Sequence, residues 1–172
     1  MVELVLRELQ GGDREALCMA VEEFRHSDPG WMFAFHFDPN ADFDAYVRQV
    51  ANWKRGRDMP TPFVPNTFLV GVVGAKIVGR LSLRHELNDA LRQDGGHVGY
   101  GVVASERGKG YARRLLELSL PLARAVGLPR IMLSCDDDNL PSSRTIEACG
   151  GVLQDRVSSG RGVLKRRYWI EL

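Results

Sequence analysis

The spacing of apolar and polar residues along the chain predicts helices first and strands later. After a short β-rich start over residues 2–6, apolar residues recur every three or four positions over 13–26 and again over 42–53. Such spacing places them on one face of a helix. Asp13 and Asp42 stand where helix N-caps are expected. We therefore expect two amphipathic helices before the first long strand.

From Thr67 onward the spacing becomes that of strands. Residues 68–73 are β-rich, and apolar residues alternate over 77–83, so the two segments predict a hairpin. Residues 152–157 and 163–170 predict a second hairpin near the end of the chain.

The segment between the two hairpins has the pattern of strand, helix and strand. A polar loop over 88–96 leads into a strand over 97–103, a helix over 108–126 and a strand over 131–135. Strands joined by such a crossover run parallel. A further helix is expected to begin near Pro141 and to end at two glycines.

Composition restricts the class of protein. The 172 residues suit one domain, 1–172, and 44% hydrophobic with 26% charged residues is typical of a soluble globular chain. The 23 basic and 22 acidic residues nearly cancel, which argues against a nucleic-acid partner. No apolar stretch approaches the roughly 20 residues of a membrane span. Cys18, Cys135 and Cys149 match no zinc spacing and follow no signal peptide, so we expect reduced thiols and a cytoplasmic location.

The segment 107–112, Arg-Gly-Lys-Gly-Tyr-Ala, carries the clearest chemical signal. A helix that starts directly after a strand presents unpaired N–H groups, and its dipole favours an anion there. Gly108 and Gly110 leave room for a phosphate, and Arg107 and Lys109 add cationic donors. Taken alone, a glycine-rich segment of this kind is more often a solvated turn than a phosphate site.

Three phosphate-binding patterns compete for these residues. A P-loop needs Ser or Thr after its Gly-Lys pair, whereas Gly110 follows Lys109. The loose dinucleotide fingerprint is matched only inside or at the end of a strand, by Gly99, Gly101 and Ala104. The pattern Arg/Gln-x-x-Gly-x-Gly/Ala is met in the required strand-to-helix setting, by Arg107, Gly110 and Ala112.

With this loop the chain resembles the GNAT superfamily of N-acetyltransferases. The resemblance implies an α/β (α+β) fold with a mixed, mostly antiparallel sheet, two splayed central parallel strands and helices on both faces. It implies acetyl-CoA as co-substrate, no metal, and a main-chain N–H near Val102 or Val103 that polarises the thioester carbonyl. The residues expected to bind acetyl-CoA are Val102, Val103, Arg107, Gly108, Lys109, Gly110, Tyr111, Ala112, Asn139 and Ser142.

A second family segment, Asn-x-x-Ala-x-x-x-Tyr-Glu-x-x-Gly, is represented by Asn139, Ser142, Ile146, Glu147 and Gly150. By resemblance, Asn139 contacts the pantetheine region. Many relatives carry a Tyr that protonates the departing thiolate, and Ile146 at that position cannot donate a proton. Cys149 or a water is a weak substitute. The resemblance covers Thr67 to the C-terminus. In the first 66 residues it is limited to two helices in the expected place.

Transfer to an amine requires the neutral form of that amine. An alkyl amine with a pKa near 10.4 is protonated at pH 7, and freeing the base costs about 4 to 5 kcal/mol, so a positioned base would help. His97 is the first candidate base, from the corresponding strand position in relatives, and a structural strand histidine is the alternative. His85 and Glu86 are weaker candidates at a strand end.

Two further segments are candidates for the acceptor side. The acidic run 136–138 follows a strand and either attracts a cationic amine or starts a helix. An aromatic cluster between the first two helices either lines the acceptor pocket or closes a core, and its members are Trp31, Phe33, Phe35, His36 and Phe37.

The sequence therefore predicts transfer of the acetyl group of acetyl-CoA to a primary amine of a small molecule or peptide by direct attack. There are two alternatives: a transferase that uses another acyl-CoA, and a non-catalytic acyl-CoA-binding module, which Ile146 keeps open. Fold similarity does not identify the acceptor. We also expect the strand over 163–170 to be an exposed edge through which two copies pair.

Overall fold

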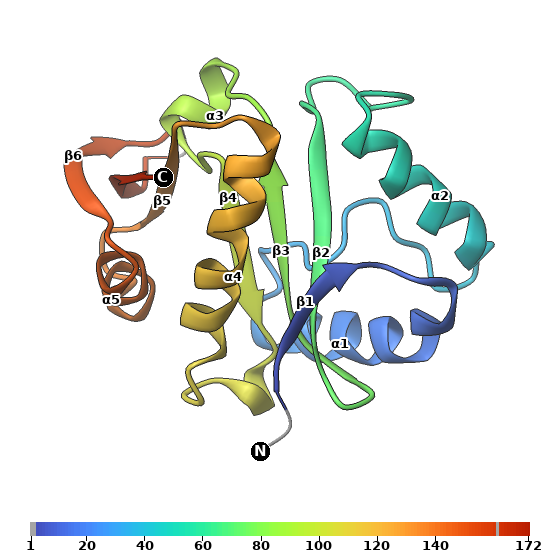
Figure 1. Cartoon of the computed structure of the whole chain (residues 1–172). Helices are drawn as coiled ribbons and strands as arrows, with labels where there is room; N and C mark the ends of the chain where they lie inside the picture. Colours follow the sequence, from blue (N-terminus) through green and yellow to red (C-terminus); the bar gives the residue numbers. More distant parts are fainter. Residues whose placement is uncertain (1–2, 161) are drawn as a thin grey trace.

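A computed structural model describes residues 3–160 and 162–172 and contains two antiparallel sheets (Figure 1). The first sheet has the order β1-β2-β3-β4. Its strands are β1 Val5–Glu8, β2 Asn66–Val73, β3 Lys76–Arg84 and β4 Val98–Val102. The second has the order β5-β7-β6; β5 is Arg130–Asp136, β6 is Val152–Ser158 and β7 is Leu164–Glu171. Both predicted hairpins are confirmed. Val2, expected in the first strand, lies outside the described residues.

Five α-helices are found among the described residues. They are α1 Arg14–Ser27, α2 Phe43–Lys54, α3 Asp89–Gln93, α4 Tyr111–Val126 and α5 Leu140–Ala148. The short helix α3 lies where a loop over 88–96 was predicted, and that prediction was incomplete. It forms because the Asn88 side chain accepts a hydrogen bond from the Leu91 N–H at 2.9 Å and so caps the first turn.

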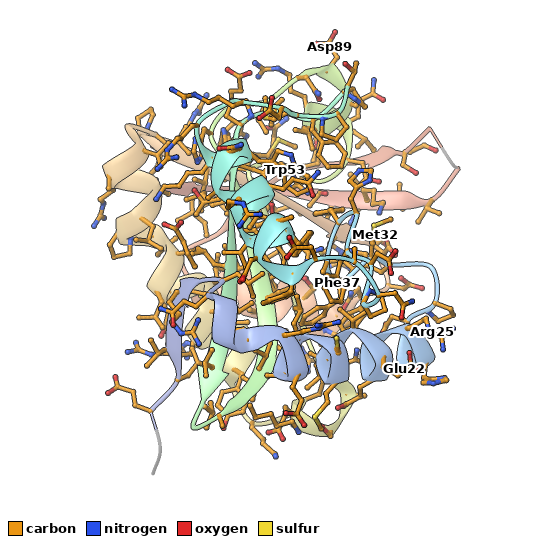
Figure 2. The ribbon with its side chains drawn as sticks, turned by 90° about the vertical axis from the view of Figure 1, so that its right-hand side faces the viewer. Glu22, Arg25, Met32, Phe37, Trp53 and Asp89 are labelled. Atoms are coloured by element: carbon orange, nitrogen blue, oxygen red, sulfur yellow. The ribbon has the colours of Figure 1, made fainter. Side chains whose placement is uncertain are left out.

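Helices cover both faces of the first sheet. Figure 2 looks onto α1, α2 and the loop that joins them, with Trp53 on α2 and Phe37 in that loop. These elements enclose one buried apolar cluster against β2 and β3. On the other face α4 buries Leu115 and Leu116 in a second cluster. The predicted mostly antiparallel arrangement with helices on both faces is confirmed.

The close approach of α4 to the sheet depends on two strand glycines. A Cβ at Gly71 would lie 2.5 Å from the Leu115 side chain, and one at Gly79 would lie 2.9 Å from it and 2.7 Å from the Gly101 carbonyl oxygen. Only glycine leaves room for Leu115 at these positions. This contact fixes where α4 begins, and therefore where the loop of residues 107–110 lies.

The strands β4 and β5 splay apart, as expected, but they form no parallel ladder among the described residues. The His97 N–H donates to the Met132 carbonyl at 2.7 Å, and the one bridge between them, Gly96 with Leu133, is antiparallel. Beyond it the first sheet ends at β4 and the second begins at β5. The expectation that two parallel strands would join one sheet is corrected to two sheets that diverge after His97.

The order of the second sheet also corrects the expected edge. β7 lies between β5 and β6 and pairs with both, so the segment 163–170 is not an edge strand. β6 is the edge instead, with Val152 and Leu153 exposed.

Candidate functional site

The loop between β4 and α4 has a backbone that requires glycine. Gly108 has a φ of 76° and Gly110, the N-cap of α4, a φ of 82°, in the left-handed region that favours glycine. No heavy atom lies within 4 Å of a Cβ built at either position. The loop therefore exposes bare backbone at the start of a helix.

The N–H groups from Gly108 of this loop into the first turn of α4 are unpaired. The Arg114 N–H donates to the Gly110 carbonyl at 3.1 Å, whereas the N–H groups of residues 108–113 have no acceptor among the described residues. Unpaired N–H groups together with the positive end of the helix dipole suit an anion with several acceptor oxygens. The predicted phosphate-binding geometry is present in the backbone.

The cationic side chains of the loop have other partners. Arg107 Nε donates to the Val102 carbonyl at 3.0 Å, and its Nη2 contacts Ser27 and pairs with Asp28, which ties α1 to the loop. Lys109 Nζ pairs with Glu106 at 2.8 Å. These side chains order the loop, so the free donors toward a phosphate are the main-chain N–H groups.

A cleft of about 800 Å³ extends from this loop between β4 and the start of α5. Its lining includes eight of the ten residues predicted to bind acetyl-CoA: Val102, Arg107, Gly108, Gly110, Tyr111, Ala112, Asn139 and Ser142. Val103 and Lys109 do not line it. The volume lies in the range of small-molecule and cofactor sites, and the residues therefore fit a pyrophosphate-containing ligand.

The hydrogen bonds of β4 decide which N–H groups face the cleft. The Val103 N–H donates to the Val78 carbonyl at 3.0 Å, so Val103 cannot supply the expected free donor. Along an antiparallel edge strand, alternate residues point their N–H groups toward and away from the partner strand. Val102 and Tyr100 are therefore the residues whose N–H groups point away from β3 and into the splay.

A pair of hydroxyl groups links β4 to α5 across the cleft. The Tyr100 hydroxyl lies 3.0 Å from Ser142 Oγ, and Asn139 Oδ1 caps α5 by accepting from the Ser142 N–H at 3.1 Å. Burial raises the pKa of Tyr100 to about 12, so the phenol keeps its proton at neutral pH. Ile146 is buried and lies outside the lining. Tyr100 has no chemical role among the predictions from the sequence, because its partner Ser142 is distant along the chain.

His97 occupies the closed end of the splay. Its Nδ1 accepts a hydrogen bond from the Met132 N–H at 2.9 Å, so the neutral ring carries its proton on Nε2. Burial, with Arg92 and Arg84 nearby, lowers the pKa of His97 to about 4. Such a ring joins β4 to β5 but has no free lone pair with which to accept a proton. The geometry supports the structural alternative.

The weaker candidate bases lie outside the cleft. His85 Nε2 is 2.9 Å from Thr67 Oγ1, and neither His85 nor Glu86 lines the cleft. In the acidic run, Asp136 pairs with Lys165 at 2.5 Å and Asp137 with Arg166 at 2.8 Å. These ion pairs offset the charges of Asp136 and Asp137, whereas Asp138 is exposed and in none of them.

The aromatic cluster divides between core and surface. Phe33 is buried in the core, Phe37 packs against Tyr46, and His36 packs against Trp53. Trp31 lines the cleft, where a Cβ at Gly101 would lie 2.8 Å from its ring, and Phe35 lines a separate pocket. Both readings of the cluster therefore apply, each to different members.

The part of the chain that the structure describes contains neither a cluster of metal ligands nor a membrane-spanning helix. Among the described residues, no three His, Cys, Asp or Glu side chains are grouped so as to hold a metal ion. None of the helices in residues 3–160 and 162–172 combines the length and apolar character needed to cross a membrane.

Comparison with known proteins agrees with this geometry. Residues 3–152 match the family model of the acetyltransferase (GNAT) domain. The ribosomal-protein-S5-alanine acetyltransferase of Vibrio fischeri has a similar structure. It superposes with a TM-score of 0.74 at 20% identity, over 98% of this chain and 92% of its own.

Two similar structures were solved with acetyl-CoA. The microcin C7 self-immunity acetyltransferase, in complex with acetyl-CoA and AMP, has a TM-score of 0.71 at 19% identity, over 99% of this chain and 93% of its own. The putative acetyltransferase yncA of Salmonella typhimurium has a TM-score of 0.62 at 20% identity, over 98% and 94%. Comparison with curated proteins gave no match. At these identities the structures establish a shared fold.

Proposed function

The chain belongs to the GNAT acetyltransferase family, with acetyl-CoA as its co-substrate, and we propose that the acceptor of the acetyl group is a primary amine. The observation that supports acetyl-CoA as the acetyl donor is the row of unpaired N–H groups over residues 108–113 at the end of the 800 Å³ cleft, and the amine acceptor is proposed from membership of the family. These groups suit the pyrophosphate of acetyl-CoA. Asn139 and Ser142 would lie along the pantetheine arm.

Acetyl-CoA supplies a thioester, and the residues of the chain would position and polarise it. The Val102 N–H points into the splay and would stabilise negative charge that develops on the carbonyl oxygen. A main-chain donor suits this task because the strand already holds it in place. Val103, the other donor expected from the sequence, is excluded by its bond to Val78.

Tyr100 is the proton donor that we propose in place of the absent family tyrosine. Ser142 and Ile146 are four residues apart on α5 and share one helix face, so the hydroxyl pair lies one turn from the family position. The Tyr100 phenol is protonated at neutral pH, and its hydroxyl lies at the cleft, where it could donate to the departing thiolate. We assign no base. Among the described residues that line the cleft there is no histidine, and each carboxylate is held in an ion pair. Water would then accept the amine proton.

The location proposed for this chemistry is the cytoplasm. Cys18, Cys135 and Cys149 are all unpaired, which is the usual state of thiols in a reducing compartment.

The experiment that tests the proposal is a thiol-release assay with acetyl-CoA and a panel of amines, amino acids and peptides. We expect at least one amine to accelerate release and to appear as its N-acetyl product by mass spectrometry. If acetyl-CoA binds but no acceptor accelerates release, the enzyme proposal is wrong and a binding module is favoured. Replacing acetyl-CoA by longer acyl-CoA esters tests the remaining alternative.

A further inference from the structure

Two arginines on β3 lie beside the cleft without a carboxylate partner. Arg80 is 1% exposed; its Nη1 donates to the Gly99 carbonyl at 3.3 Å and its Nη2 to the Met32 carbonyl at 2.9 Å. Its Nε is buried with no hydrogen-bond partner. Arg84 lies four residues further along β3, on the same face, and is mostly buried. No ion pair among the described residues includes either arginine. Two like charges are therefore held together; the carboxylate of Asp94 acts on Arg84 electrostatically but forms no ion pair with it.

The contacts of Arg80 hold its position but do not neutralise it. Its guanidinium lies 3.8 Å from the centre of the Trp31 ring and 5.1 Å from that of Phe35. Burial, and then the nearby charge of Arg84, lower the pKa of Arg80. An uncompensated buried cation is costly to a fold, and proteins commonly balance it with an anion. Among the described residues, Arg80 has carbonyl and aromatic partners but no carboxylate that would supply this balance.

Arg84 presents free donors to a small pocket. Its Nη1 donates to the carbonyl groups of Gly95 and Gly96, at 3.2 and 2.9 Å, while its Nε and Nη2 have no acceptor among the described residues. These two nitrogens form the edge of the guanidinium that binds a carboxylate through two parallel hydrogen bonds. The pocket that Arg84 lines has a volume of about 180 Å³, with Asn66, Ser82 and Asn88 as its other polar members.

The pocket lies next to the strand segment that borders the cleft. A Cβ at Gly99 would lie 3.4 Å from Arg84 Nη2 and 3.9 Å from Arg80 Nη1, and the next residues, Tyr100 and Gly101, line the cleft. A cavity of about 150 Å³ holds a molecule the size of benzene. The pocket therefore suits a group of about six to eight non-hydrogen atoms.

We propose that the acceptor is a small amine that carries an oxyanion, and that Arg84 binds this oxyanion while Arg80 adds positive potential behind it. A carboxylate, as in an aminocarboxylic acid, can accept two parallel hydrogen bonds from the planar edge of Arg84. A phosphonate or phosphate can accept the same pair of hydrogen bonds. This inference rests on the proposed amine acetyltransferase function, because it names the class of acceptor for the same site.

The test compares matched ligands by calorimetric titration into the protein saturated with coenzyme A. The ligands are β-alanine, 3-aminopropylphosphonate, n-propylamine and putrescine, which vary the charge at nearly constant length. We expect one of the two oxyanion ligands to bind at least about tenfold more tightly than n-propylamine, because hydrogen bonds to charged groups are the strong ones. The stronger of the two identifies a carboxylate or a phosphorus oxyanion.

Arg84→Gln should remove this preference, and Arg84→Lys should keep a weaker one because it retains the charge without the planar edge. Arg92→Gln is the matched control: Arg92 is an exposed cation on α3 that does not line the pocket, so its loss should leave the preference intact. Thermal melting of each variant checks folding. Equal binding of all four ligands, no binding of either oxyanion, or an unchanged preference in Arg84→Gln and Arg84→Lys would overturn the proposal.

Thiol release with the same compounds separates this inference from the proposed function. Oxyanion-selective binding without release by any acceptor would contradict the transferase proposal and keep the anion site. Release with amines regardless of their charge, in the wild type and in Arg84→Gln alike, would support the transferase and contradict the anion site.

Discussion

Gly110→Asp is the substitution that most directly tests the loop at the start of α4. It adds a carboxylate at the helix N-cap, where φ is 82° and no atom lies within 4 Å of the new Cβ. The side chain therefore fits without a clash and points into the space where a pyrophosphate would accept from the N–H groups of residues 108–113. The perturbation is of charge and not of packing.

Its two effects have opposite signs. In the protein without ligand, the left-handed backbone costs a residue with a Cβ roughly 1–2 kcal/mol, while an Asp at an N-cap stabilises a helix by about 1 kcal/mol. The stability should thus change little. Against a bound pyrophosphate, two unit charges about 5 Å apart repel by about 3 kcal/mol at an effective dielectric constant of 20. After screening at this exposed loop, we expect a Kd for coenzyme A that is roughly 10- to 100-fold higher.

Isothermal titration with coenzyme A and thermal melting measure both effects. Gly127→Asp is the matched control, because Gly127 caps the other end of α4 with a φ of 95° and open space around its Cβ. There a carboxylate meets the negative end of the helix dipole, so it should lower the melting temperature more than Gly110→Asp and leave the affinity unchanged. Gly110→Asn separates charge from backbone strain. Wild-type affinity in Gly110→Asp would refute the placement of the pyrophosphate at this loop.

Three further predictions follow from the same region. Tyr100→Phe should lower kcat about tenfold or more with little change in the KM for acetyl-CoA, as expected for loss of a general acid, and unchanged kcat in steady-state assays would exclude the role. Because the folded-state pKa of His97, about 4, lies below its ordinary value of 6.5, its contribution to stability should be complete above pH 6.5 and decline by about 2–3 kcal/mol as the pH falls to 4. Urea unfolding at both pH values should show a decline that is larger by this amount in the wild type than in His97→Gln, because His85, whose pKa is also lowered by burial, contributes in both proteins; equal declines would contradict the prediction. Gly79→Ala should destabilise the protein by about 1–3 kcal/mol, since its Cβ would lie 2.7 Å from the Gly101 carbonyl oxygen, and an unchanged melting temperature would show that α4 can shift freely.

The part of the site that the sequence predicts is the part built from local backbone. The two glycines at 108 and 110 directly follow a strand and precede a helix, so neighbouring residues alone determine their φ values and their unpaired N–H groups. The roles of Arg107 and Lys109 were less predictable, because their partners depend on where α1 ends and where Glu106 points. His97 illustrates the same limit: only the position of Met132, on a different strand, shows that its Nδ1 is already used.

Arg80 and Arg84 could not be recognised from the sequence for a further physical reason. Apolar residues alternate along β3, which is the pattern of a strand with one face in water, and arginines on the intervening positions then count as ordinary surface charges. In the structure both faces of β3 are buried, because α4 covers one face and the elements of Figure 2 cover the other. Burying cations on a face that helices cover costs free energy of folding, so their presence there suggests that they serve another purpose. The contradiction between the strand pattern and the observed burial is therefore the strongest reason to look for an anion at this site.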